Sequence, residues 1–344
     1  MKNRTKLIFI IALLYLAMLV FGFVCVLAAA NAYVKNNVDL NYIACYEMKS
    51  GSEINAYLPA ACTSIVFGNS NNYKDVIETA NSVYVITKDN SQNVKLYYKS
   101  DIKTAYILSS KTIIMPEDCS KMFYFLNKLT NITFENITTE NVTNMESLFS
   151  YCTNLESINL ELFKTDKVTN FSSMFYKCEK LKEIASLESL NLSEATTVKN
   201  MFACCYALKS LDLSTFNTGK VTDFSQLVFN CKELRSINLS NISVENAKNF
   251  TSMFYGCMLL EQIDLSSFNT TNVNSTTQMF AECSSLSTVF IGEGWDMAGV
   301  VESINMFYNC ISLTFGDGSN YDQTKTDVTY AVAGDSGYLT LKTA

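Results

Sequence analysis

The chain has 344 residues, of which 48% are hydrophobic, with only 2 prolines and no histidine. This composition excludes a disordered chain, and the missing histidine removes the most common general base and the most common metal ligand. The formal net charge of −7 disfavours binding to the phosphate backbone of nucleic acids. We therefore expect no nucleic-acid partner, no cofactor and no enzymatic activity.

The first 32 residues predict a membrane or secretion segment. The chain begins with the basic stretch MKNRTK, and residues 7–27 follow without a charge. This apolar run is long for the core of a signal peptide and suits a helix that spans a bilayer. The next residues, AAANA, offer a cleavage site after Ala32, so a retained signal anchor and a cleaved signal peptide both stay open. In either case we expect the rest of the chain to lie outside the cytoplasm.

Residues 33–60 carry little pattern and are predicted to form a linker. Residues 61–118 are predicted to form a β-rich cap, because five short runs have the composition of strands and are separated by turns rich in Asn, Asp and Ser. These runs are SIVFG (64–68), SVYVITK (82–88), VKLYYKS (94–100), TAYILS (104–109) and KTIIMP (111–116). Such a cap would cover the apolar end of a stack of repeats.

Residues 119–313 repeat with a period close to 26. When the copies are aligned on the pattern M-F-x-x-C, the first ends at Leu126 and the next seven end at a cysteine, with spacings of 26 or 27 residues. The seven are Cys152, Cys178, Cys205, Cys231, Cys257, Cys283 and Cys310. A fixed period over eight copies indicates a repeat protein in which each copy packs on its neighbours.

Each copy contains two predicted elements. Met145, Leu148, Phe149 and Cys152 lie at positions i, i+3, i+4 and i+7, as on one face of a two-turn α-helix. The residue before this pattern is an Asn or Asp, which is typical of a helix N-cap: Asn144, Asn170, Asp223 and Asn249. The motif L-x-x-I-x-L follows and ends with the period of two that a strand requires. The sequence thus predicts an α/β leucine-rich repeat solenoid, in which a ladder of parallel strands is backed by short helices.

Two further segments depart from the repeat. In the fourth copy, extra residues lie around 187–192 and Val198 stands three residues before Met201, where other copies have six. We expect a bulged or widened turn at this place. Residues 314–344 are rich in turn-forming residues, contain two short strand-like runs and are predicted to be the C-terminal cap.

The seven repeat cysteines occupy one phase of the repeat and would lie one per copy along a line. A metal ion needs ligands that converge on a point, so we interpret these cysteines as a buried ladder of small apolar side chains. Disulfides between neighbouring copies are the alternative. Cys204 is predicted to be a surface or half-buried thiol, and the sequence leaves open whether Cys45 and Cys62 form a disulfide.

The outward positions of L-x-x-I-x-L form the candidate binding surface. Two columns of side chains are expected to follow the strand ladder. The first column consists of Glu156, Lys182, Lys209, Arg235 and Glu261, and the second of Asn159, Asp212, Asn238 and Asp264. Regularly spaced polar and charged groups could grip an extended ligand, whereas the alternative interpretation is that they only make the surface soluble.

Three stretches of the chain resemble the BspA-like leucine-rich repeat surface proteins. They are YILSSKTIIMPEDCSKMF (106–123), NFTSMFYGCMLLEQIDLSSFNTTNV (249–273) and FGDGSNYDQTKTDVTYA (315–331). The resemblance extends over about residues 61–342, and the irregular fourth copy and Leu126 depart from the pattern. It implies a secreted or surface-attached solenoid that is used for attachment to host or neighbouring cells.

We therefore expect an extracytoplasmic protein, tethered to the membrane by its N-terminal helix or secreted. Its expected partners are proteins or glycans on a host or neighbouring cell. A structural spacer or coat component without a specific ligand is the alternative.

Overall fold

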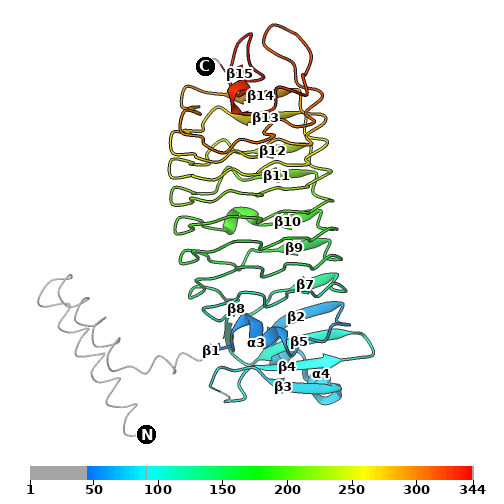
Figure 1. The fold of residues 1–344 in the computed structure, drawn as a ribbon. Helices are drawn as coiled ribbons and strands as arrows, with labels where there is room; N and C mark the ends of the chain where they lie inside the picture. The colour runs from blue at the N-terminus through cyan, green and yellow to red at the C-terminus, as the bar shows by residue number, and fades with distance from the viewer. Residues whose placement is uncertain (1–44, 90, 343–344) are drawn as a thin grey trace, which may run out of the picture. The chain divides into compact units, whose positions relative to one another are not determined.

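The computed structural model describes residues 45–89 and 91–342, whose regular secondary structure is mainly short β-strands with few helices, joined by many turns (Figure 1). Residues from Tyr46 onward belong to one compact unit. The predicted membrane segment lies outside the described residues, as does the greater part of the predicted linker. Within the described ranges, no helix is long and apolar enough to cross a membrane.

The N-terminal part is built on a five-stranded sheet with the order β3-β4-β5-β2-β7. Strands β3, β4 and β5 are antiparallel neighbours, and β2 lies parallel between β5 and β7. The strands are β2 (Ser64–Asn69), β3 (Ser82–Val85), β4 (Lys95–Lys99), β5 (Thr104–Ser109) and β7 (Asn131–Thr133). Because β7 belongs to the first repeat copy, this sheet continues directly from the cap into the repeats. The sequence predicted the four cap strands, whereas it did not predict η2 (Ser70–Asn72) and α4 (Lys74–Thr79).

A short helix, α3 (Gly51–Asn55), covers the N-terminal end of the repeats. The Gly51 N–H donates to the carbonyl of Asp118 at 2.8 Å, and a Cβ at Gly51 would lie only 2.5 Å from the carbonyl oxygen of Ser120. The Asn55 side-chain amide donates to the carbonyls of Met122 and Tyr124. Residues 46–60 are thus part of the cap, and their interpretation as a linker was wrong.

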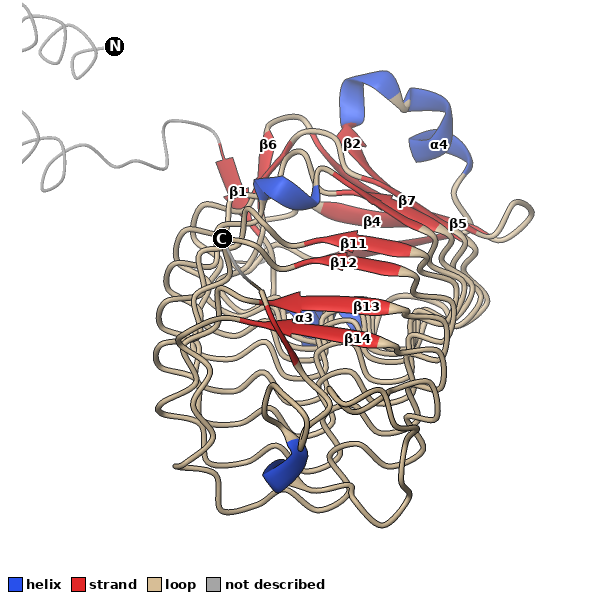
Figure 2. Ribbon diagram, turned by 90° about the horizontal axis from the view of Figure 1, so that it is seen from above, coloured by secondary structure: helices blue, strands red, loops and turns tan. Residues whose placement is uncertain are grey.

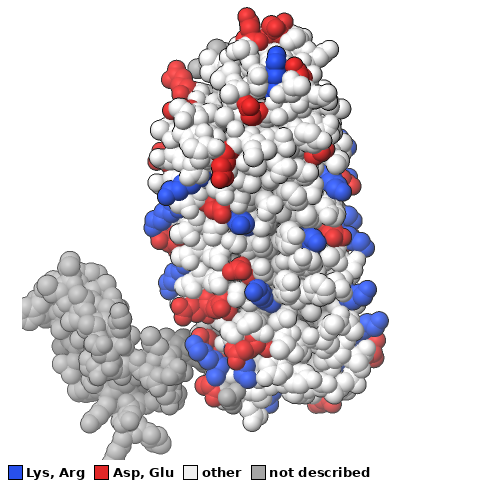
Figure 3. Space-filling model, in the orientation of Figure 1, with Lys and Arg blue, Asp and Glu red and all other residues white. Residues whose placement is uncertain are grey.

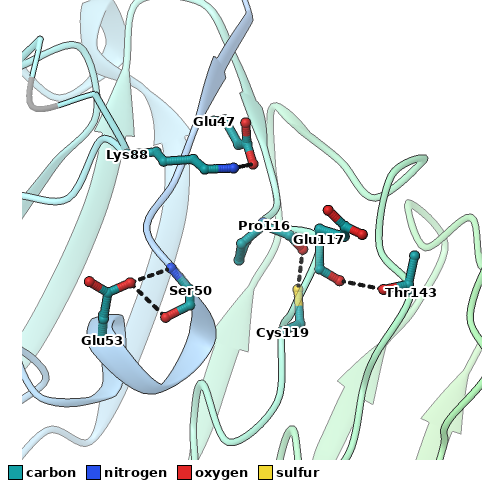
Figure 4. Close-up of polar contacts among 8 residues, drawn as sticks. All are labelled: Glu47, Ser50, Glu53, Lys88, Pro116, Glu117, Cys119 and Thr143. Carbon is teal, nitrogen blue, oxygen red and sulfur yellow. Dashed lines mark hydrogen bonds and ion pairs between the residues drawn. The ribbon is translucent and has the colours of Figure 1, made fainter.

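The start of this cap is fixed by local polar contacts (Figure 4). The N–H and the hydroxyl of Ser50 both donate to the carboxylate of Glu53, at 3.0 and 2.6 Å. Lys88 forms an ion pair with Glu47, which lies in β1 (Cys45–Glu47). This strand joins β6 (Thr112–Ile114) and β8 (Ile137–Thr138) in a second, three-stranded sheet.

Each later copy contributes one short strand to a common wall, which Figure 2 shows in a view along the stack. These strands are β9 (Ser157–Asn159), β10 (Glu183–Ala185), β11 (Ser210–Asp212), β12 (Ser236–Asn238), β13 (Gln262–Leu265) and β14 (Thr288–Ile291). They pair in parallel as β9 with β10, β11 with β12 and β13 with β14, and β15 (Thr340–Leu341) returns from the C-terminal cap to pair with β14. Parallel pairing is as expected, but among the described strands the ladder is interrupted between β7 and β9, β10 and β11, and β12 and β13.

The segments predicted as two-turn helices are not helices. Residues 145–152 and their counterparts form consecutive tight turns, and the only helix of the described residues in the range 119–313 is the 3₁₀ helix η3 (Leu187–Ser189). In every copy two residues four positions apart have positive φ, for example Ser147 at 57° and Tyr151 at 62°. The predicted inward residues are nevertheless buried. Asn144 accepts the N–H of Glu146 and so closes a turn instead of capping a helix.

The turn segments of successive copies are joined by backbone hydrogen bonds that all have the same direction. At each of the seven junctions, four N–H groups of one copy donate to carbonyls of the next copy. From the second copy, Met145, Ser147, Phe149 and Tyr151 donate to Asn170, Ser172, Met174 and Tyr176 over 2.8–3.0 Å. Of the intervening N–H groups, those of Leu148 and Ser150 bond three residues back, to Met145 and Ser147, and that of Glu146 bonds to the Asn144 side chain. The N–H groups of the turn segments at these seven junctions are therefore paired without any helix.

Stacked phenylalanines fill the core behind the turn wall. Phe149, Phe175 and Phe202 are fully buried, with ring centroids 5.4 and 5.7 Å apart and nearly parallel ring planes. The stack is interrupted by Val228 and resumes from Phe254 to Phe307. In the fourth copy the extra residues form η3, and Ser186, which lies directly before this helix, has a φ of 58°. The irregular sequence of this copy therefore forms the widened turn that was expected.

We expect Phe175→Ala to lower the free energy of unfolding by about 3–5 kcal/mol, because it removes a ring that packs between two others and leaves a cavity. Urea unfolding followed by circular dichroism measures this change. The matched control is Phe125→Ala, since the Phe125 ring is 54% exposed and its loss should cost less than about 0.5 kcal/mol. Equal effects of the two substitutions would contradict the packing described.

Candidate binding surface

The strand wall brings the predicted columns together, and all nine candidate side chains are exposed. Backbone hydrogen bonds from Lys182 to Glu156 and from Arg235 to Lys209 place neighbouring members of the first column side by side. The residues of the second column follow the register of the strands, as in the pairing of Asp212 with Asn238. Residues 26 positions apart in the chain therefore form a common surface.

The first column contains one neutralised pair and one pair of cations. The Lys182 ammonium lies 2.8 Å from the Glu156 carboxylate, and this hydrogen bond lowers the pKa of Glu156. In the part of the chain that the structure describes, neither Lys209 nor Arg235 has a carboxylate within 4.0 Å. Two adjacent positive charges are thus available to a ligand at the middle of the wall.

The second column also has a structural role. Asn159, Asp212, Asn238 and Asp264 each accept the N–H of the residue two positions later, at 2.9–3.2 Å. These bonds close the turn that ends each strand, and the contacts from Ser214 lower the pKa of Asp212. Burial favours protonation of Asp264, but hydrogen bonds from Lys342 and Ser266 outweigh it and lower the pKa. A ligand can therefore use only those side-chain acceptor sites of this column that do not already accept a backbone N–H.

A third column of exposed or half-exposed side chains lies between the first two and was missed in the sequence. It consists of Ser157, Glu183, Ser210, Ser236, Gln262 and Thr288. The signal was present, since these residues precede the inward Ile, Leu or Val and so share the outward phase of a strand. Its hydroxyl and amide groups add neutral hydrogen-bonding capacity to the charged first column.

Three hollows lie on the wall at the three interruptions of strand pairing. Their volumes are 310 Å³ between β7 and β9, 430 Å³ between β10 and β11 and 420 Å³ between β12 and β13. The second hollow has Leu187 and Leu211 among its apolar lining, and Lys182, Glu188 and Asp212 among its polar lining. The strand edges that face such a hollow carry backbone groups without a strand partner, which an extended ligand can use.

The repeat cysteines do not contribute to this surface. All seven are buried and free, and each thiol donates to a backbone carbonyl of the preceding copy, as Cys178 does to Phe149 at 3.2 Å. Cys204, predicted as a surface or half-buried thiol, is only 4% exposed, and Cys62 is a buried free thiol that donates to the carbonyl of Ser64. Among the described residues, no group of three or more acidic or Cys side chains is arranged to hold a metal ion.

Burial of the thiols makes stability depend on alkaline pH. Burial raises the pKa of Cys152 and of Cys283 to about 12, whereas a thiol of the unfolded chain has a pKa of about 8.5. Between these values the folded state holds a proton that the unfolded state has lost, so stability falls as pH rises. Below about pH 8.5 both states are protonated and these thiols cause no pH dependence.

We expect the free energy of unfolding of the wild type to fall above about pH 8.5, by about 1.4 kcal/mol per pH unit for each buried thiol. Cys152→Ala should make this slope shallower by the contribution of one thiol. Urea unfolding at a series of pH values from 7 to 10 measures both slopes. Identical slopes for the variant and the wild type would show that Cys152 is not held protonated.

The fold and this surface define a mainly β protein whose parallel sheets are compatible with a repeat architecture. The model of the family described as "Mycoplasma protein of unknown function, DUF285" matches residues 117–233 and 199–321. The two matches together span more than half of the chain, which therefore belongs to this family. No curated protein matches the chain, and no solved structure matches it.

Proposed function

We propose that the chain is an extracytoplasmic leucine-rich repeat solenoid of the BspA-like type, and that its strand wall binds a protein or glycan on a host or neighbouring cell. The N-terminal segment would tether it to the membrane, or the protein would be secreted after cleavage behind Ala32. Parallel strands, copy-to-copy hydrogen bonds and the DUF285 domain, which is found in BspA-like surface proteins, support this proposal.

The observation that carries the proposal is the adjacent pair Lys209 and Arg235 on the strand wall. Both are exposed, and their backbones are hydrogen bonded to each other across two copies. The hollow between β10 and β11 lies on one side of this pair and the hollow between β12 and β13 on the other. A ligand that runs along the stack could place acidic groups on the cations and neutral groups in the hollows.

The alternative function is a surface spacer without a specific ligand. It is favoured by the parts of the wall that are already occupied, namely the ion pair of Glu156 with Lys182 and the turns closed by the second column. A spacer requires only that these contacts hold the stack together. The two functions differ in whether the cations are needed for attachment.

We expect the double variant Lys209→Glu, Arg235→Glu to weaken attachment by about tenfold or more, because it replaces two adjacent attractive charges by repulsive ones. Saturable binding of the purified protein to cultured cells, immobilised matrix proteins and a glycan array would be measured. The control is Lys199→Glu, which makes the same kind of charge change at an exposed residue of the turn wall.

Attachment that is unchanged in the double variant, or reduced equally by Lys199→Glu, would contradict a role of the strand wall. Absence of saturable binding by the wild type to any of the surfaces would favour the spacer.

A further inference from the structure

The C-terminal end of the turn wall is only half capped. In the eighth copy, the N–H of Phe307 donates to the carbonyl of Thr326 at 2.9 Å and the N–H of Asn309 donates to the hydroxyl of Tyr321 at 3.0 Å. The equivalent N–H groups of Ser303 and Asn305 have no acceptor among the described residues. In all seven preceding copies these two positions donate to the next copy. The last copy therefore keeps two donors oriented as if a further segment were to follow.

Large apolar side chains flank these two donors. Val301 is 82% exposed and Ile304 is 71% exposed, and Ile311 and Tyr308 extend the apolar surface along the same copy. Earlier copies have only polar or charged residues at the two positions concerned. The position of Val301 is held by Glu117, Thr143, Thr169, Thr196, Thr222, Lys248 and Asn274, and that of Ile304 by Ser120, Glu146, Ser172, Lys199, Ser225, Thr251 and Thr277. An apolar change confined to the last copy points to a contact that only this copy makes.

The end is also acidic. Residues 293–342 contain seven acidic residues and two lysines, and Figure 3 shows Asp and Glu side chains gathered at this end of the stack. A hollow of 600 Å³ lies beside the apolar surface, lined by Tyr308, Ile311, Tyr321 and Asp322 among others. The Asp322 carboxylate accepts from Thr324 and lies 3.9 Å from the Lys325 ammonium, and its remaining acceptor capacity suits a basic side chain of a partner. The aromatic and aliphatic walls suit the methylene stem of such a side chain.

We propose that this edge, formed by Val301, Ile304, Tyr308 and Ile311 with the N–H groups of Ser303 and Asn305, binds an extended basic polypeptide of a partner protein. The partner's backbone carbonyls would accept the two donors, which continues the hydrogen-bonding pattern of the stack. Its apolar side chains would cover Val301 and Ile304, and its basic side chains would face the acidic surroundings.

A second copy of the chain fits this edge poorly. Two C-terminal ends would bring acidic groups against acidic groups. The N-terminal end of another copy has its carbonyls at Asp118, Met122 and Tyr124 already occupied by Gly51 and Asn55. The occupant is therefore a different protein, and this surface is separate from the strand wall of the proposed function.

The experiment uses an alternating Lys-Val decapeptide and its Glu-Val counterpart as probes, with binding to the whole protein followed by fluorescence anisotropy. We expect the Lys-Val peptide to bind the wild type, and the variant Val301→Asn, Ile304→Thr to weaken it by about tenfold or more. This variant restores the residues of the seventh copy, Asn274 and Thr277. The control Ile102→Thr changes an apolar side chain that is 51% exposed in the N-terminal cap and should leave binding unchanged.

Equal binding of the Glu-Val peptide, or a variant that binds as tightly as the wild type, would overturn the proposal. So would self-association of the wild type that the variant abolishes, because a second copy would then be the occupant. Arg235→Glu should leave peptide binding intact, which separates a failure here from a failure of the strand-wall proposal.

Discussion

The one-directional hydrogen bonds of the turn wall are the constraint on which the rest of the structure depends. At every junction, the turn segments are joined by four N–H groups of one copy and four carbonyls of the next. Within the turn segments, one end of the wall therefore presents alternate carbonyls and the other alternate N–H groups, whereas an ordinary strand edge presents both along its length. The two caps must differ accordingly. Gly51 and Asn55 supply donors at the N-terminal end, and the Thr326 carbonyl and the Tyr321 hydroxyl supply acceptors at the C-terminal end.

The same constraint explains which residues each copy uses. A turn segment reaches its neighbour only if two residues of each copy adopt positive φ, and Ser, Asn, Gln, Lys and Gly hold most of these positions. At Gly256 a Cβ would lie only 2.2 Å from the side-chain oxygen of Asn230, so a larger residue there would have to displace that side chain. The cysteine at the end of each turn segment is small enough to be buried, and its thiol can donate to a carbonyl of the copy before it. Period, turn conformation and cysteine are thus consequences of one backbone arrangement.

The sequence predicted which side chains point inward better than it predicted the backbone that places them there. Met145, Leu148, Phe149 and Cys152 are buried as the pattern indicated, but consecutive turns with bonds three residues back bury nearly the same positions as a helix does. The spacing of apolar residues indicates which side chains point inward, but it does not indicate which carbonyl accepts each backbone N–H. The Ser, Asn and Gly residues that alternate with the apolar ones were the available signal against a helix.

For the candidate surface, the outward columns followed from the strand period, as the exposed Lys209 and Arg235 show. The ion pair of Lys182, the turn-closing role of Asp212 and the hollows depend on side-chain conformation and on the spacing between strands. The sequence pattern of a single copy specifies neither the side-chain conformation nor the spacing between strands. The open C-terminal edge depends on which N–H groups of the last copy lack an acceptor, and this follows only from the three-dimensional register of the copies.

The most direct test of this account is the detection of scalar couplings across hydrogen bonds in a deuterated sample by nuclear magnetic resonance. The hydrogen bonds of the turn wall predict a coupling between the amide nitrogen of Phe149 and the carbonyl carbon of Met174, which belongs to the next copy. A coupling from Phe149 to the carbonyl of Met145, four residues earlier, would mean that the segment is a helix and would contradict the account.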